Sequence, residues 1–162
     1  MQILHTHSTN YSRGIVYFYT FITLLIVAIF ILVTKNVLLE DIEGAPILTG
    51  IMVLVLSLFI FVNYRAYRMH FDVTQDTVII HGVFSTHEIK KSDIKTIQRS
   101  PVPFGFRLFG ASLLGGLYYI PGVGTTWIAM GNFKDGVLLK TNNKNFFITP
   151  KHPDEFIQHV QS

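Results

Sequence analysis

The sequence predicts an α+β membrane protein, in which a two-helix transmembrane hairpin is followed by an antiparallel β-barrel or sandwich that a C-terminal helix caps. Three observations predict this fold class. Two long runs carry no charged residue, the segments after them alternate apolar and polar side chains, and the last residues place apolar side chains at helical spacing. The composition agrees, because 49% of the 162 residues are hydrophobic and only 14% are charged.

Two apolar runs, residues 14–34 and 45–64, are each long enough to cross a bilayer. As a helix the first would extend about 31 Å, which matches the roughly 30 Å hydrocarbon core. It also exceeds the apolar part of a secretory signal, so we expect it to stay attached. Neither run contains the ionisable side chain that an ion-coupled transporter needs within the membrane. We therefore expect an N-terminal tail of residues 1–13, a hairpin of residues 14–66 and a domain of residues 67–162.

The residues that flank the two runs predict an orientation. Arg13 precedes the hairpin and Arg65 and Arg68 follow it, whereas the link between the runs is net acidic. Because basic residues are retained on the cytoplasmic side, we expect both termini to be cytoplasmic. Tyrosines near the same ends would lie at the same membrane face, as in an interfacial aromatic belt. The predicted membrane-interface residues are Arg13, Tyr17, Tyr64, Arg65, Tyr67 and Arg68.

Several short strands are predicted after the hairpin. In MHFDVTQD, apolar Met69, Phe71 and Val73 alternate with polar residues, which is the period of a half-buried strand. The other segments are VIIHGVF, HEIKK, DIKTIQ, and the pair GVLLKT and NFFIT around an Asn-Asn-Lys turn. A helix is predicted after Pro153, with Phe156 and Val160 on one apolar face.

The stretch from Arg107 to Lys134 has no Asp, Glu, Lys, Arg or His between its ends and is rich in glycine. Six glycines and Pro121 disfavour a third membrane helix, which would also separate the last strands from the others. A phosphate-binding loop is disfavoured because the Lys-Ser/Thr ending is missing. We expect strands with glycine at their bends, packed as core or resting partly on the bilayer or another subunit.

A candidate contact patch begins this stretch in PFGFRLFG, where prolines favour an extended segment. Its residues are Phe104, Phe106, Arg107 and Phe109. Aromatic rings with an arginine are enriched at interface hot spots, so these residues are candidates for contact with a subunit or with lipid headgroups. The alternative is that Phe104 and Phe109 are core residues and Arg107 is a solvated or intradomain charge.

No catalytic, cofactor-binding or metal site is predicted. The chain has no cysteine, which excludes a disulfide scaffold, a thiol nucleophile and a cysteine-ligated metal. His5 and His7 form an H-x-H pair without an evident third ligand, so we expect them in a solvated tail. The other histidines are scattered along the chain. The chain is therefore expected to be neither an enzyme nor a nucleic-acid binder.

The domain resembles the bacterial pleckstrin-homology-like (PH-like) domains. The likeness rests on FDVTQDTVIIHG, KKSDIKTIQ, RLFGASLLGG, GNFKDGVLLKT and FFITPKHPDEFI, and spans roughly residues 67–160. The resemblance implies a seven-stranded bent sandwich or barrel with a C-terminal helix, no cofactor, no established catalysis, and a place in the bacterial plasma membrane. The PH domains of eukaryotes that bind phosphoinositides carry clustered Lys and Arg residues around the turn that follows the first strand. Here that turn is Thr74-Gln75-Asp76-Thr77, which argues against such recognition.

The function expected from these features is that of a non-enzymatic, membrane-anchored interaction or scaffolding module at the cytoplasmic face. It would bind a protein partner or itself, and act by fixing orientation and raising effective concentration. An alternative is a small immunity protein that protects its cell against membrane-active peptides. A third interpretation is an accessory subunit of a transporter or enzyme.

Overall fold

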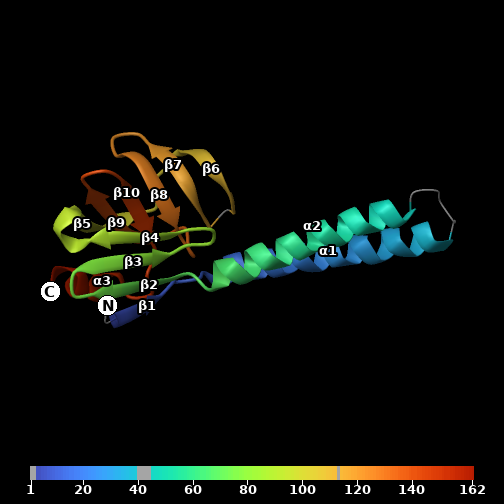
Figure 1. Ribbon diagram of the computed structural model, residues 1–162, viewed down its shortest axis with the longest axis horizontal. Coiled ribbons are helices and arrows are strands. Elements are labelled where there is room, and N and C mark those ends of the chain that lie inside the picture. The colour runs from blue at the N-terminus through green and yellow to red at the C-terminus, as the bar shows by residue number, and fades with distance from the viewer. Residues whose placement is uncertain (1–2, 40–44, 113) are drawn as a thin grey trace. The chain divides into compact units, whose positions relative to one another are not determined.

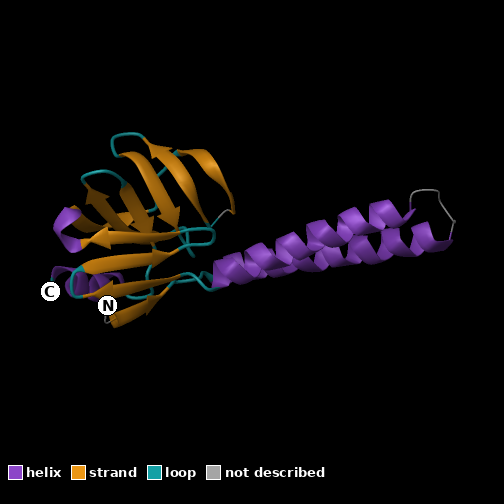
Figure 2. Cartoon of the chain, in the orientation of Figure 1, coloured by secondary structure: helices purple, strands orange, loops and turns teal. Residues whose placement is uncertain are grey.

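The computed structural model describes residues 3–39, 45–112 and 114–162 (Figure 1). The chain forms two compact units. One consists of Arg13–Tyr64, and the other combines the residues up to Ser12 with Arg65–Ser162. Strands occur only in the second unit among the described residues (Figure 2).

The helical unit contains α1 (Arg13–Leu39) and most of α2 (Ala45–Tyr67). Both helices are long and apolar enough to cross a membrane, which agrees with the two predicted spans. Thr20 and Thr23 donate their hydroxyls to helix carbonyls four residues earlier, at 2.8 and 2.7 Å, so these polar groups need no water. Large apolar side chains are exposed along both helices, as expected of a lipid-facing surface. The predicted acidic link at 40–44 lies outside the described residues.

The β unit is a sandwich of two sheets with a C-terminal helix. The first sheet has the order β1-β2-β3-β4, from β1 (Ile3–Ser8), β2 (His70–Thr74), β3 (Thr77–His81) and β4 (Thr86–Lys90). A short 3-10 turn, Lys91–Asp93, leads to the second sheet. The order there is β5-β9-β10-β8-β7-β6, from β5 (Ile94–Pro101), β6 (Phe106–Ser112), β7 (Gly115–Ile120), β8 (Gly124–Ala129), β9 (Asp135–Thr141) and β10 (Asn145–Ile148).

The sandwich differs in detail from the expectation. Its sheets keep separate edges, so it is not a closed barrel, and the described residues form ten strands rather than seven. All pairs are antiparallel except β8 and β10, which run parallel. The predicted helix is present as α3 (Pro153–Gln161), with Phe156 and Val160 buried.

Buried side chains cover both faces of the second sheet. Three consecutive residues of β9, Val137, Leu138 and Leu139, are all buried, although neighbours in a strand point to opposite faces. Leu138 belongs to a cluster with Ile120, Ile128, Met130 and Phe147, against which Val102, Tyr118 and Val123 pack. The fully buried Phe71 and Phe156 meet edge to face at 6.2 Å and anchor α3 to the first sheet.

The segment before α1 is part of the domain, whereas the sequence predicted a tail. β1 pairs with β2 from Ile3 opposite Thr74 to Ser8 opposite His70. The segment continues with a bridge between Thr9 and Pro150 and a hydrogen bond from the Asn10 amide to the Thr149 carbonyl at 2.8 Å. The physical reason is that β2 would otherwise present an unpaired edge.

The glycine-rich stretch forms three strands, β6, β7 and β8, as the glycine argument predicted. The pairing of β6 with β7 shifts register twice, which marks bulges. Gly116 shows why glycine is needed: its φ is +149°, and a Cβ there would lie 2.4 Å from the Phe109 carbonyl oxygen.

Candidate functional site

An apolar cavity of about 160 Å³ opens at one margin of the sandwich. On one side it is bounded by the β3–β4 loop and the start of β4, and on the other by β6, β7, β8 and β10. Four lining residues are glycines, Gly82, Gly110, Gly115 and Gly116, which place no side chain in the space. The β-bulges and glycines that shape this margin therefore also create the cavity.

One polar pair lies inside this cavity. Ser85 Oγ and His87 Nε2 are 2.9 Å apart. The His87 ring lies 4.7 Å from the Trp127 ring and 5.4 Å from the Phe146 ring, between centroids. Burial, and secondarily Lys144, lowers the pKa of His87, so its ring is neutral near pH 7. The cavity is thus an uncharged, apolar site with aromatic and aliphatic walls and one hydrogen-bonding pair.

Exposed aromatic rings surround the cavity. Phe84 from the β3–β4 loop is 55% exposed and Phe109 from β6 is 72% exposed, and both line the opening. Phe104, 84% exposed, lies edge to face with Phe106 at 6.4 Å, just before and at the start of β6. The interpretation of Phe104 and Phe109 as core residues is therefore wrong. That these rings form a contact site stays a prediction.

Arg107 is held within the domain. Its Nε and Nη2 donate to the Tyr118 hydroxyl at 2.9 and 2.6 Å, and the guanidinium lies 5.3 Å from the Tyr118 ring centroid. Tyr118 is the residue opposite Arg107 in the β6–β7 ladder. The arginine therefore stiffens the edge strand that carries Phe106 and Phe109.

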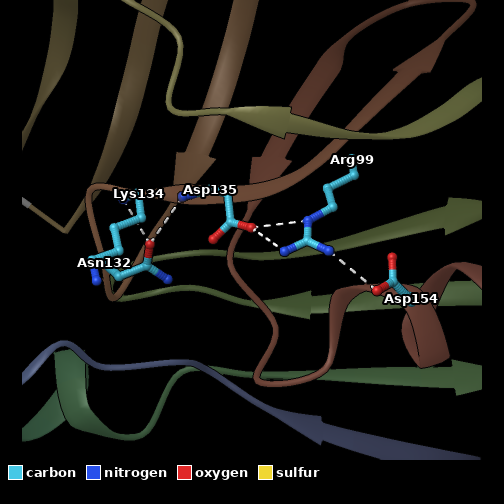
Figure 3. A network of polar contacts seen from close by, with 5 residues as sticks. All are labelled: Arg99, Asn132, Lys134, Asp135 and Asp154. Atoms are coloured by element: carbon cyan, nitrogen blue, oxygen red, sulfur yellow. Dashed lines mark hydrogen bonds and ion pairs between the residues drawn. The ribbon is translucent and has the colours of Figure 1, made fainter.

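A network of polar side chains around Arg99 has a structural role. Arg99 on β5 donates from Nε and Nη2 to Asp135 at 2.9 and 2.6 Å, and from Nη1 to Asp154 of α3 at 3.2 Å (Figure 3). The Asn132 side-chain oxygen accepts from the amides of Lys134 and Asp135 (Figure 3). Its hydrogen bonds with Asp135 raise the pKa of Arg99. This network ties α3 and the β8–β9 turn to the sheet.

Residues 69–162 match a family model described as a bacterial PH domain. The chain belongs to this family. The predicted resemblance is thereby confirmed, and the match runs from just before β2 to the end of α3. No curated protein and no solved structure matches the chain. β1 lies outside the matched residues. This bacterial PH domain therefore takes its first strand from residues that precede the apolar helices in the sequence.

The predicted membrane-interface residues of this PH-domain protein lie in the first turns of α1 and at or just beyond the end of α2. Arg13 begins α1, and Tyr17 and Tyr64 are exposed. Arg65 Nε donates to the Val83 carbonyl at 3.2 Å, and Arg68 lines a surface pocket with Arg65. That these residues meet a membrane face stays a prediction.

Tyr11, one of the tyrosines expected at the membrane face near the first apolar run, packs within the domain. Its ring meets that of Tyr67 at 5.5 Å, and its hydroxyl donates to the Ala66 carbonyl. Burial raises the pKa of Tyr11 to about 12. The residues that enter α1 and leave α2 are thereby tied within one folded unit.

The structure also assembles histidines that the sequence left apart. His5 stacks on His159 of α3 at 3.7 Å, and His7 Nε2 lies 3.0 Å from His159 Nδ1. Burial lowers the pKa of His7, and His159 and His5 lower it further, while Glu155 opposes them. The histidine pair that was expected to be solvated is therefore part of a packed cluster. No local spacing could reveal this cluster, because His159 lies more than 150 residues after His5 and His7.

Proposed function

We propose that this bacterial PH domain is a membrane-anchored, non-enzymatic interaction module that binds an apolar side chain of a protein partner in the cavity beside His87. The family and the two apolar helices fit a membrane-associated module. The observation that carries the proposal is the apolar cavity bordered by two exposed rings, one from the β3–β4 loop and one from β6. Exposed aromatic clusters of this kind are typical of interaction sites.

The size of the cavity selects the kind of ligand. Sites for cofactors and drug-sized molecules usually measure about 300–1,000 Å³. A dry cavity of about 150 Å³ takes one benzene-sized ring. At about 160 Å³, this cavity therefore suits a single aromatic or branched aliphatic side chain. The rings of Phe84 and Phe109 would exclude water around it, and Ser85 with His87 would offer one hydrogen bond.

The anchor would give this weak site its effect. We propose that the helices lie in the bacterial plasma membrane with both termini cytoplasmic, which the flanking Arg13, Arg65 and Arg68 support. Confinement raises the effective concentration of a membrane partner, so one apolar anchor can suffice. The β2–β3 turn carries no basic residue, which supports a partner other than a phosphoinositide.

Site-specific photocrosslinking in intact cells tests this function. A photoreactive phenylalanine analogue at position 84 or 109 should crosslink to a discrete protein, and the same analogue at position 4 should not. Leu4 is the matched control, because it is also exposed and apolar but lies on β1, at the opposite edge of the first sheet.

Competition sharpens the result. Phe109→Ser should reduce the crosslink from position 84 at least tenfold, since removal of an interface ring costs about 2 kcal/mol or more. Equal crosslinking from positions 4 and 84, or crosslinks to lipid alone, would contradict the proposal. A crosslinked product of twice the chain mass would show that the partner is a second copy of this chain.

A further inference from the structure

We propose that His70, Asp72 and His81 bind a divalent transition-metal cation, with Zn²⁺ as the best match. One ligand atom from each residue lies within 4.8 Å of the others. Asp72 Oδ2 lies 3.1 Å from His81 Nε2 and 3.7 Å from His70 Nε2. Ligands of a tetrahedral zinc site are separated by roughly 3.3 Å, given zinc–nitrogen and zinc–oxygen bonds of about 2.0–2.2 Å. The two separations from the carboxylate oxygen are thus already close to this spacing.

The sheet itself creates the convergence. His70 and Asp72 are two residues apart on β2 and share a face, and His81 is the residue directly opposite His70 on β3. Their neighbours Phe71 and Ile80 are buried in the core, so the three ligands occupy the other face. The two imidazoles stack at 4.1 Å with their planes 11° apart, and both direct Nε2 toward the carboxylate.

The surroundings prepare two of the ligands for a metal. His70 Nδ1 lies 2.9 Å from the Arg68 carbonyl, which can only accept, so Nδ1 carries the proton and the neutral ring keeps its lone pair on Nε2. The Thr6 hydroxyl donates to Asp72 Oδ1 at 2.7 Å and leaves Oδ2 for coordination. Hydrogen bonds of this kind, between a metal ligand and a second residue that orients it, are typical of metal sites.

The burial of Asp72 gives a reason for such a site. The residue is only 4% exposed, and a buried carboxylate needs compensation. Without metal, His81 Nε2–H donates to Oδ2; metal binding moves that proton to Nδ1 or to solvent and places the cation between the ligands. Two histidines and one carboxylate make a three-ligand set that leaves a fourth position open, as in many zinc sites.

Two of the ligands, His70 and His81, line a surface pocket of about 440 Å³ together with Arg65 and Arg68. Zn²⁺ with one carboxylate carries a net charge of +1, which the guanidinium groups repel. An anionic fourth ligand from solvent offsets that repulsion, so affinity should rise with an anion such as chloride in the buffer.

Calorimetric titration of Zn²⁺ into the tag-free full chain in mild detergent tests the proposal. One Zn²⁺ should bind per chain, with affinity reduced at least tenfold by His81→Ala or Asp72→Asn and about tenfold by Thr6→Val, the outer partner. His159→Gln is the control, because it disrupts the other histidine cluster and should leave the affinity unchanged.

A second readout keeps the test independent of folding defects. Co²⁺ bound to the unaltered chain should show the intense visible absorption of a tetrahedral nitrogen–oxygen site, and His70→Gln should abolish it. The proposal is overturned if no saturable binding occurs, or if only His159→Gln removes it. It is also overturned if inorganic phosphate, rather than Zn²⁺, raises the melting temperature and Arg65→Gln cancels the rise.

Discussion

Replacement of Thr9 by valine tests whether the segment before α1 belongs to the PH domain. Thr9 is 5% exposed, and its hydroxyl donates to the carbonyl of buried Met69 at 2.8 Å. Valine has nearly the same shape but no hydroxyl, so the carbonyl loses this partner. A buried polar group left without its hydrogen bond costs about 1–3 kcal/mol. For a domain of this size, 1 kcal/mol lowers Tm by about 4 °C, so we expect a fall of about 4–12 °C.

The chain offers a built-in probe for this measurement. Trp127 is the single tryptophan and lies on β8, so its fluorescence reports melting of the β unit and not of the helices. Thr20→Val is the matched control, since the Thr20 hydroxyl donates to its own helix at Val16 and is exposed. The control should shift Tm by less than about 2 °C, the size expected of a surface change. If Thr9→Val shifts Tm no more than the control, the packing of the N-terminal segment described above is refuted.

Three further predictions use the same chain. Gly116→Ala should lower Tm far more than Gly122→Ala, because both positions have positive φ but only Gly116 also lacks space for a Cβ; equal shifts would contradict the packing of β6 on β7. Burial lowers the pKa of His87 and of His7, so the stability these neutral rings contribute is full above about pH 6.5, the unfolded value, and is lost as the pH falls through their folded values. Tm should therefore fall as the pH drops below about 6.5, and less steeply in His87→Gln; a Tm that rises on acidification would reject this assignment. Because the chain has no cysteine, Asp41→Cys and Asn142→Cys can be probed singly with an impermeant thiol reagent in intact cells. Position 41 should be labelled and position 142 protected, and the reverse result would invert the proposed orientation.

The elements that the sequence predicted correctly are those whose signal is local. Met69, Phe71 and Val73 are buried as their alternation predicted, and α3 begins at Pro153 with its apolar face inward. The helix ends were less accurate, because helical structure continues beyond the apolar run into residues such as Asn36 and Leu39. Hydrophobicity marks the part of a helix that meets lipid, and hydrogen bonding decides where it stops.

The parts that could not be predicted depend on pairing across the chain. Nothing in ILHTHS indicates that it joins a strand more than 60 residues later, since its two histidines, one threonine and one serine carry no strong apolar alternation. The cavity likewise depends on Phe84 of the β3–β4 loop and Phe109 of β6 lining one space, although the two belong to segments that are distant in the sequence. His70 and His81 become neighbours only through the β2–β3 register, although their place on a predicted hairpin was a usable signal.

The added strand β1 constrains the membrane arrangement independently of charge. The chain leaves the β unit after Ser12 and returns to it at Arg65, and β1 is hydrogen-bonded to β2 on either side of that excursion. If the helices cross a bilayer, the hairpin therefore begins and ends at the same face, because β1 and β2 cannot pair through the membrane. A single crossing would leave β2 with an open edge and Met69 without its hydrogen bond from Thr9. Damage to the β1–β2 pairing, as in Thr9→Val, should thus also loosen the adjoining segment, in which the Tyr11 hydroxyl donates to the Ala66 carbonyl.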